Sequence, residues 1–183
     1  MPELVGEARE SATAAANPWS VDGVSVEEMI PAETSPGREE PVTDSPTGWV
    51  RKHVRRYVES EGKKGHRWSG VTTLLFTTRG RRTGKLRRTA LIYGRDHDRY
   101  LVVASNGGSK PHPNWYQNLV ADPHVSVQVG EETFEAIART ATAPEKPGLW
   151  EQMVAIWPDY AKYQKRTERE IPVVIIERQP PEG

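Results

Sequence analysis

The segment with the clearest chemical character is a cationic run between two stretches rich in β-branched and apolar residues. Six of the ten residues from 79 to 88 are basic, and Gly80 and Gly84 lie among them. Glycines permit a tight turn that presents backbone amides, and arginines donate paired hydrogen bonds to phosphate or carboxylate oxygens. Like charges this close repel one another, so the pattern predicts a β-hairpin that binds an anion. Two alternatives stay open, a solvated hairpin tip and nucleic acid, although no aromatic residues interleave as base stacking needs.

Residues 103–108 indicate a place for a flat ring. An apolar strand there ends in the small residues Ala104, Ser105, Asn106, Gly107 and Gly108. Small side chains leave room for a ring, and the Ser105 hydroxyl and the loop amides could bond its edge. An ordinary loop at the end of a strand would show the same composition.

Residues 113–119 predict a short helix after a proline. Trp115 and Tyr116 on this helix could belong to the core or form a platform for a ligand. Asn114 and Asn118 lie one turn apart, so they could cap the helix or bond a ligand.

Three aromatic residues follow at steps of three, Trp157, Tyr160 and Tyr163. This spacing places them on one face of a helical turn, where they could form a packing stripe. The functional alternative is a pair of phenols beside an electron acceptor, able to polarise a carbonyl or to supply a proton. A phenol with its ordinary pKa of about 10 stays protonated at neutral pH, as a hydrogen-bond donor must.

The elements that must position these residues are mostly strands. We expect strands at 70–78, 89–93, 100–104, 124–129, 133–141 and 172–177, the second and third paired as one hairpin and the fourth and fifth as another. Short helices are expected at 113–120 and 144–156, and the chain shows no βαβ alternation. The pattern predicts a mainly β, α+β domain, either a barrel or a sandwich.

The charges are divided along the chain. Residues 1–47 hold ten acidic and two basic side chains, and residues 48–183 hold 15 acidic and 23 basic ones, so the net charges are −8 and +8. We expect 1–47 to be a disordered acidic tail, 48–178 the folded domain and 179–183 a disordered C-terminus. The basic domain suggests an anionic ligand that the tail could screen; a merely solvated tail is the alternative.

Composition also excludes some chemistry. The chain has no cysteine, which removes thiolate nucleophiles and cysteine-ligated metals. No apolar stretch is long enough for a membrane span, and no signal peptide is evident, so the protein is expected in the cytoplasm. Residues 49–58 predict an amphipathic helix with one cationic face. That helix could pack on the domain, cap a ligand site or make weak peripheral contact with an anionic membrane surface.

Several of these motifs occur together in one known family. The sequence carries Thr-Thr-x-Gly-Arg-Arg-Thr-Gly at 77–84, Ala-Ser-x-Gly-Gly at 104–108 and Pro-x-Trp-Tyr-x-Asn-Leu at 113–119. Ala138-Arg139, Trp-Pro-x-Tyr-x-x-Tyr-Gln at 157–164 and Arg-Glu-Ile-Pro-Val-Val at 169–174 follow in order. In these marks the stretch from about 48 to 177 resembles the deazaflavin-dependent nitroreductase family of oxidoreductases.

The resemblance implies a split β-barrel like the flavin-binding pyridoxamine-phosphate-oxidase barrels, with short peripheral helices. It also implies coenzyme F420, an 8-hydroxy-5-deazaflavin with a phosphodiester and a polyglutamate tail; FMN on the same barrel is the alternative. The implied activity is hydride transfer from the reduced coenzyme to a quinone, enone or nitro compound. The implied cofactor-binding residues are Arg81, Arg82, Thr83, Lys85, Arg87, Arg88, Thr89, Ala90, Leu91, Ile92, Val103, Ala104, Ser105, Asn106, Asn114, Trp115, Tyr116, Gln117 and Asn118.

For catalysis the resemblance implies Tyr160, with Ser105 and Tyr163 near it. Arg82 stands where the family commonly has lysine, and Trp157 where its nitroimidazole-reducing members have tyrosine. The expected partner is a small-molecule electron acceptor, with no metal and no nucleic acid, in a monomer or homodimer. A protein that binds the deazaflavin without turnover is a further alternative.

Overall fold

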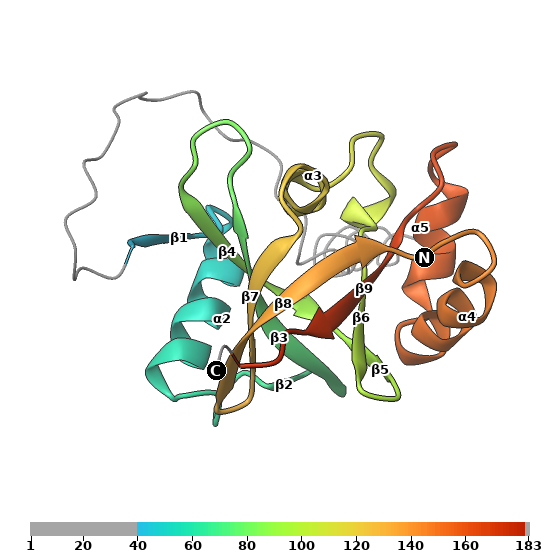
Figure 1. Ribbon diagram of the computed structural model, residues 1–183. Coiled ribbons are helices and arrows are strands. Elements are labelled where there is room, and N and C mark those ends of the chain that lie inside the picture. The colour runs from blue at the N-terminus through green and yellow to red at the C-terminus, as the bar shows by residue number, and fades with distance from the viewer. Residues whose placement is uncertain (1–39, 182–183) are drawn as a thin grey trace, which may run out of the picture.

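A computed structural model describes residues 40–181 (Figure 1). This part of the chain forms nine strands, four α-helices and one short 3-10 helix. The strands are β1 (Val42–Asp44), β2 (Arg67–Trp68), β3 (Val71–Arg79), β4 (Leu86–Ile92), β5 (Gly94–Asp96), β6 (Arg99–Val103), β7 (His124–Val129), β8 (Glu132–Thr140) and β9 (Val173–Arg178). The helices are α2 (Gly48–Glu59), η1 (Asn106–Gly108), α3 (Asn114–Ala121), α4 (Lys146–Ile156) and α5 (Asp159–Lys165).

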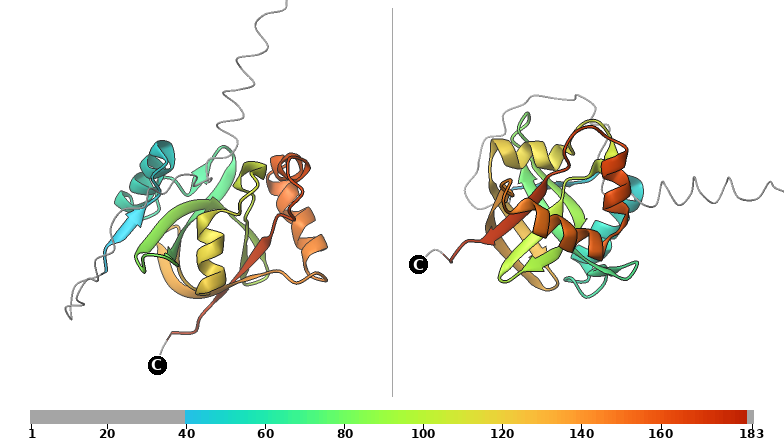
Figure 2. Two further views of the ribbon diagram at one scale, coloured as in Figure 1. Left: turned by 90° about the horizontal axis from the view of Figure 1, so that it is seen from above. Right: turned by 90° about the vertical axis from the view of Figure 1, so that its right-hand side faces the viewer.

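The strands form one strongly curved sheet in the order β1-β4-β3-β7-β8-β9-β6-β5, with β2 added beside β3 (Figure 2). Every pairing is antiparallel except that of β1 with β4. The curvature brings β4 near β6 without joining them in register. A sheet that curls back on itself with helices at its periphery is a split β-barrel, so the predicted fold class is confirmed.

Alternation along the strands builds the barrel interior. Phe76, Leu91, Val127 and Ile176 lie on the inner face, as the cross-strand registers require, and all are buried. On the outer side of β6 and β9, Leu101, Val103, Val173 and Ile175 form a second apolar cluster with α4 and α5. Burial on both faces explains why these strands lack a strict alternation of apolar and polar residues.

Helix α2 packs its apolar stripe on the domain. Val50, Val54 and Tyr57 are completely buried, while the basic side chains Arg51 and Arg55 are exposed. The stripe is therefore occupied, and membrane contact through 49–58 is not supported. Among the described residues, no helix has the length and apolar character needed to cross a bilayer.

One sequence prediction about strand pairing is wrong. The strands near 89–93 and 100–104 do not form a hairpin, because β6 pairs with the short strand β5 and with β9, whereas β4 pairs with β3 and β1. At Gly94, the first residue of β5, an added Cβ would lie 2.7 Å from the Met153 sulfur, so α4 packs closely against β5 there. The tail was expected to be disordered through residue 47, but Val42–Asp44 is strand β1; residues 1–39 lie outside the described residues.

Candidate active site

Four segments from three parts of the sequence gather along one end of the barrel. They are the β3–β4 hairpin, the loop that contains η1, helix α3 and helix α5, and they lie along the upper side of Figure 1. The view from above in Figure 2 keeps the same order, with α3 between the hairpin and η1. The hairpin, the η1 loop and α3 hold most of the predicted cofactor-binding residues, and the η1 loop and α5 hold the predicted catalytic ones.

The hairpin turn is held by its own backbone. The Gly80 amide donates to the Lys85 carbonyl at 2.8 Å, and the Gly84 amide donates to the Gly80 carbonyl at 2.8 Å. Gly84 has a φ of +67°, a conformation that L side chains rarely adopt. The turn therefore projects Arg82, Thr83 and Lys85 into solvent, as the sequence predicted for an anion-binding tip.

Three of the six basic side chains of the hairpin are already engaged. Arg79 makes a paired interaction with Glu40, at 2.8 and 3.0 Å. Arg88 donates from Nε to Asp44 at 2.7 Å. Arg81 donates to Asn118 at 3.1 Å and to Gln117 at 2.9 Å, in a contact that joins the hairpin to α3.

The other three basic side chains are Arg82, Lys85 and Arg87. None of them makes a side-chain hydrogen bond or ion pair with another described residue. Arg82 and Lys85 are exposed and Arg87 is half-buried. Carboxylates neutralise Arg79 and Arg88, and two amide oxygens accept hydrogen bonds from Arg81. The other three side chains therefore have both their charge and their donors available for a ligand.

Helix α3 closes the end of the barrel beside the hairpin. The buried Asn118 amide donates to Thr78 Oγ1 at 3.1 Å, and Trp115 packs edge-on against Phe76 with ring centroids 5.4 Å apart. Tyr116 is half-buried, and its hydroxyl lies 2.9 Å from Thr140 Oγ1. The helix begins at Asn114, so the N-cap position belongs to Pro113 and not to Asn114. Trp115 and Asn118 thus have structural partners before any ligand is considered.

Strand β4 carries a buried polar group that could bond a cofactor. Thr89, Ala90, Leu91 and Ile92 are buried, and the Thr89 hydroxyl makes no hydrogen bond in the described part of the chain. Thr89 lies two residues from the unpartnered Arg87, on the same face of the strand. A buried hydroxyl without a hydrogen bond is unfavourable. A polar atom of a ligand on this face of β4 could supply the missing hydrogen bond. The donors present fit the proposed cofactor class.

The loop after β6 is held by a residue that the sequence analysis did not assign to the site. The Arg169 guanidinium donates to the carbonyls of Ser105 at 2.7 Å, Ser109 at 2.8 Å and Ala104 at 3.3 Å. It also lies 3.1 Å from His112 Nδ1, the ring nitrogen that accepts from it. The one available signal was the position of Arg169 in the last family motif. Its four contacts fix the backbone of the predicted ring-binding loop.

A continuous set of hydrogen bonds joins the predicted segments. Gln117 accepts from Arg81 and donates to the His112 carbonyl at 2.9 Å, and His112 meets Arg169. Asn106 donates to the Pro111 carbonyl at 3.0 Å. The structure therefore brings the hairpin, α3 and the 103–112 loop into one connected unit, with His112 and Arg169 as members that the sequence reasoning missed.

The charge state of His112 gives this unit a pH dependence. Burial, and then the positive charge of Arg169, lowers the pKa of His112 below its usual value. Because the folded-state pKa is lower than the unfolded one, neutral His112 favours folding above its ordinary pKa of about 6.5, and this contribution is lost as the pH falls through the folded value.

We therefore expect the wild-type protein to lose more unfolding free energy than His112→Gln when the pH falls from 7 to 5. Urea titrations of both proteins at the two pH values measure this difference. The pKa of His53 is also lowered by burial, but His53 is present in both proteins and cancels in the comparison. Equal losses in the two proteins would show that His112 does not titrate against Arg169.

The predicted catalytic tyrosines lie together on α5, within the second apolar cluster. Tyr160 is 3% exposed and Tyr163 is 2% exposed, and their rings are 6.2 Å apart. Burial raises the pKa of both phenols, that of Tyr163 to about 12, so both stay protonated. The 3-10 helix η1 packs against α5, where a Cβ on Gly108 would lie 2.5 Å from the Tyr163 carbonyl oxygen. Ser105, just before η1, is thereby held close to α5, and its catalytic role remains a prediction.

A row of three half-buried tryptophans joins distant parts of the chain. Trp49 of α2 stacks on Trp68 of β2 at 5.8 Å, and Trp68 meets Trp157 at 5.7 Å. Trp157 follows α4 directly and also touches the cluster that holds Tyr160. Trp157 therefore contacts both the tryptophan row and the cluster that contains the two tyrosines.

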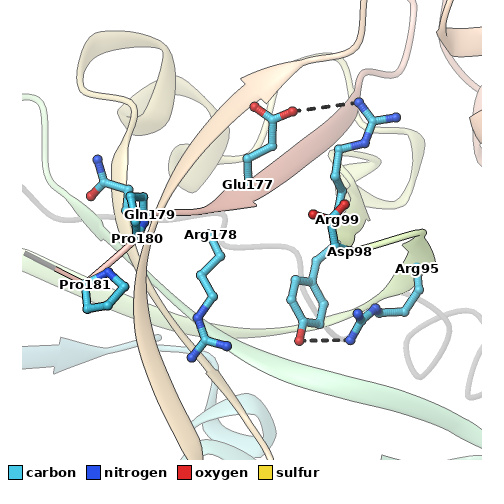
Figure 3. Close-up of a pocket in the computed structure, with 9 residues that line it drawn as sticks. Arg95, Asp98, Arg99, Glu177, Arg178, Gln179, Pro180 and Pro181 are labelled. Carbon is cyan, nitrogen blue, oxygen red and sulfur yellow. Dashed lines mark hydrogen bonds and ion pairs between the residues drawn. The ribbon is translucent and has the colours of Figure 1, made fainter.

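A cavity of about 540 Å³ lies elsewhere, beside β5, β6 and the end of β9 (Figure 3). Most of its charged side chains already have partners. Arg95 donates to the Tyr100 hydroxyl at 3.0 Å, Arg99 pairs with Asp96 and Glu177, and Arg178 pairs with Glu132. Internal neutralisation of this kind leaves little charge for a ligand, so the hairpin end is the better candidate. Residues 40–181 also contain no cluster of potential metal ligands.

The fold and the site together define a class, namely split β-barrel proteins with a cationic hairpin at one end of the barrel. The family model described as F420H(2)-dependent quinone reductase matches residues 49–178. An F420H(2)-dependent quinone reductase of Mycobacterium tuberculosis is 40% identical over 133 residues, which are 70% of this chain and 89% of that protein. The chain belongs to the F420H(2)-dependent quinone reductase family, and the resemblance noted from the sequence is confirmed.

Solved structures agree with this assignment. One of an F420-H2 dependent reductase is 42% identical, with a TM-score of 0.54 over 57% of this chain and 93% of that one. Another, described as a domain-swapped dimer, is 39% identical, with a TM-score of 0.55 over 73% of this chain and all of that one.

Proposed function

We propose that this protein binds reduced coenzyme F420 at the hairpin end of the barrel and reduces a quinone. Family membership supports the cofactor and the acceptor class. The observation that carries the placement is the division of the hairpin cations. Arg82, Lys85 and Arg87 have no partner within the described chain, and the Thr89 hydroxyl beside them is buried without a hydrogen bond.

The residues have separate tasks in this proposal. Arg82, Lys85 and Arg87 bind the acidic part of the coenzyme, with Thr83 and the turn amides beside them. The loop 103–106, fixed by Arg169, and helix α3 border the ring. The bound coenzyme supplies a hydride, and the protein supplies orientation, exclusion of water and stabilisation of charge on the acceptor.

Tyr160 is the proposed hydrogen-bond donor to the acceptor oxygen, with Ser105 and Tyr163 near it. Burial keeps its phenol protonated over the whole physiological range, as a donor requires. Its neighbours Trp150 and Tyr163 contact its ring, at 6.5 and 6.2 Å between centroids, so the ring is fixed by packing. A fixed donor costs little reorganisation when charge develops on an acceptor.

The test of the function is a titration of the purified protein with coenzyme F420 while its fluorescence is followed, together with turnover of the reduced form with a quinone. Saturable binding and turnover support the proposal. Binding of FMN alone would assign the barrel to the flavin alternative, and binding of F420 without turnover of quinones, enones or nitro compounds would make the protein a carrier.

For Tyr160 we predict a loss in turnover without a loss in binding. Tyr160→Phe should lower kcat by about tenfold to a hundredfold, since one hydrogen bond to developing charge is removed. The Kd for coenzyme F420 should stay within about twofold of wild type. Tyr100→Phe is the matched control, because it also removes one phenol hydroxyl from a largely buried ring, beside the cavity of β5 and β6 and away from the hairpin end. A Tyr160→Phe protein with unchanged kcat would exclude Tyr160 as the donor.

The cellular location and the oligomeric state are also part of the proposed function. We infer that the protein works in the cytoplasm as a homodimer or a monomer, on a small-molecule acceptor. The solved relative described as a domain-swapped dimer favours the dimer. Sedimentation of the full chain at several concentrations distinguishes the two states.

A further inference from the structure

The acidic segment just before α2 neutralises two of the hairpin cations. Glu40 accepts both hydrogen bonds of its pair with Arg79, and Asp44 accepts from Arg88. The hydrogen bond from Arg79 lowers the pKa of the Glu40 carboxyl, so Glu40 is ionised at neutral pH. Two of the six positive charges of the hairpin are thus matched by residues of the same chain.

The same segment covers the free edge of β4. Strand β1 runs parallel to β4, with Val42 opposite Leu86, Thr43 opposite Arg87 and Asp44 opposite Arg88. The Ser45 amide continues the pairing with a 2.9 Å hydrogen bond to the Arg88 carbonyl. Without β1, the backbone groups of this edge, next to the unpartnered Arg87, would be open to a ligand or a second strand.

The contact between β1 and β4 is short and partly exposed to water. Strand β1 has three residues, and Val42 and Thr43 are exposed. The side chains of Glu40 and Arg79 are 44% and 45% exposed, and those of Asp44 and Arg88 are 24% and 22% exposed. Ion pairs open to water contribute little to stability, and salt screens them. A ligand with several negative charges can therefore compete with this segment.

The segment lies outside the residues that the family model matches. The family match begins at residue 49, after β1. Eight further acidic residues precede Glu40 in the sequence, against two basic ones. The barrel and its hairpin thus lie within the family match, and the acidic sequence lies in front of it.

We propose that residues 40–45 act as an internal competitor at the cationic hairpin, so that Glu40 and Asp44 determine which anionic ligands bind there and how tightly. The segment occupies Arg79, Arg88 and the backbone edge of β4. A ligand can then bind to Arg82, Lys85 and Arg87 without displacing it. Ligands with few, well-placed charges bind, and long polyanions bind weakly because they must displace β1. This inference rests on the proposed function, which supplies the anionic cofactor.

The test compares full-length proteins that differ by two charges. Glu40→Gln/Asp44→Asn frees Arg79 and Arg88. The matched control is Glu61→Gln/Glu131→Gln, which removes two carboxylates near Lys63, at the end of the barrel that carries the β7–β8 turn. In 20 mM salt we expect coenzyme F420 to bind Glu40→Gln/Asp44→Asn about fivefold to tenfold more tightly than wild type, and the control to match wild type. In 0.5 M salt the difference should fall to about twofold or less.

A second probe, poly-L-glutamate, separates this inference from the proposed function. We expect its affinity for Glu40→Gln/Asp44→Asn to rise by at least about tenfold in low salt, a larger change than for the coenzyme. Hydrogen exchange at the amides of residues 42–45 should accelerate when poly-L-glutamate binds wild type.

Each outcome decides one of the two ideas. Equal affinities of wild type and Glu40→Gln/Asp44→Asn for both probes overturn the internal competitor, whether or not the coenzyme binds. Absence of coenzyme binding in every protein overturns the proposed function, and the poly-L-glutamate ordering then still decides the inference. A control variant that gains as much affinity as the test variant shows only an effect of net charge and also overturns it.

Discussion

Arg82→Glu/Arg87→Glu should weaken the binding of coenzyme F420 by at least about 100-fold, which corresponds to about 2.7 kcal/mol. The change turns two unpartnered cations into two anions beside the acidic part of the ligand, so attraction becomes repulsion. Neither side chain has a partner within the described chain, so the fold should be retained. Fluorescence titration gives the Kd, and thermal unfolding checks the fold.

The control for that variant is Lys63→Glu/Arg67→Glu, which makes the same change of net charge near the β7–β8 turn. Both positions are exposed. We expect its Kd to stay within about threefold of wild type, because exposed charges farther away than a Debye length of about 10 Å are screened. If coenzyme affinity survives the double reversal at 82 and 87, or falls equally in the control, the hairpin is not the anion site.

Local pattern was enough to predict most of the elements of this fold. The helix at 49–58, the strand at 70–78 and the hairpin of 124–129 with 133–141 are confirmed within a few residues, because each carries a strong apolar period and clear turn residues. The family motifs then supplied the barrel and the cofactor class, which periodicity alone had left open between a barrel and a sandwich.

What local pattern missed depends on contacts between distant residues. Strand β1 has three residues in a proline-rich acidic stretch, and only its pairing with β4 makes it a strand. The partner of β6 is β9, about 70 residues later, so the proximity of 89–93 to 100–104 in sequence was misleading. Six basic residues in one hairpin look equivalent in sequence, but the fold gives Arg79, Arg81 and Arg88 internal partners and leaves the other three.

At the candidate site, local sequence pattern also failed to identify Arg169, because its contacts are with distant residues. A single arginine near the start of the last strand has no local pattern that marks it as important. Its significance arises from the carbonyls of Ala104, Ser105 and Ser109, about 60 residues earlier, which converge on one guanidinium. Such convergence is a property of the folded chain, and it makes Arg169 the position where we expect the largest loss of stability.

Arg169→Met should lower the free energy of unfolding by about 2–4 kcal/mol. Hydrogen bonds to a charged group contribute about 1.5–3 kcal/mol each, and the half-buried setting, with some access of water to the freed carbonyls, reduces the sum. Arg169→Lys should recover part of the loss, because an ammonium keeps the charge but cannot span four acceptors in a fork geometry. Urea unfolding measures all three proteins.

Arg67→Met is the control for packing and charge, because Arg67 is exposed and makes no side-chain hydrogen bond or ion pair with another described residue. We expect a change within about 0.5 kcal/mol there.

In Arg169→Met, the freed loop should also raise the Kd for coenzyme F420, whereas a loss confined to the global fold would leave the Kd of the folded fraction unchanged. Since Arg169 bonds the carbonyl of Ser105 and not its hydroxyl, Ser105→Ala should leave stability close to wild type. An Arg169→Met protein as stable as Arg67→Met would mean that the loop keeps its conformation without the guanidinium.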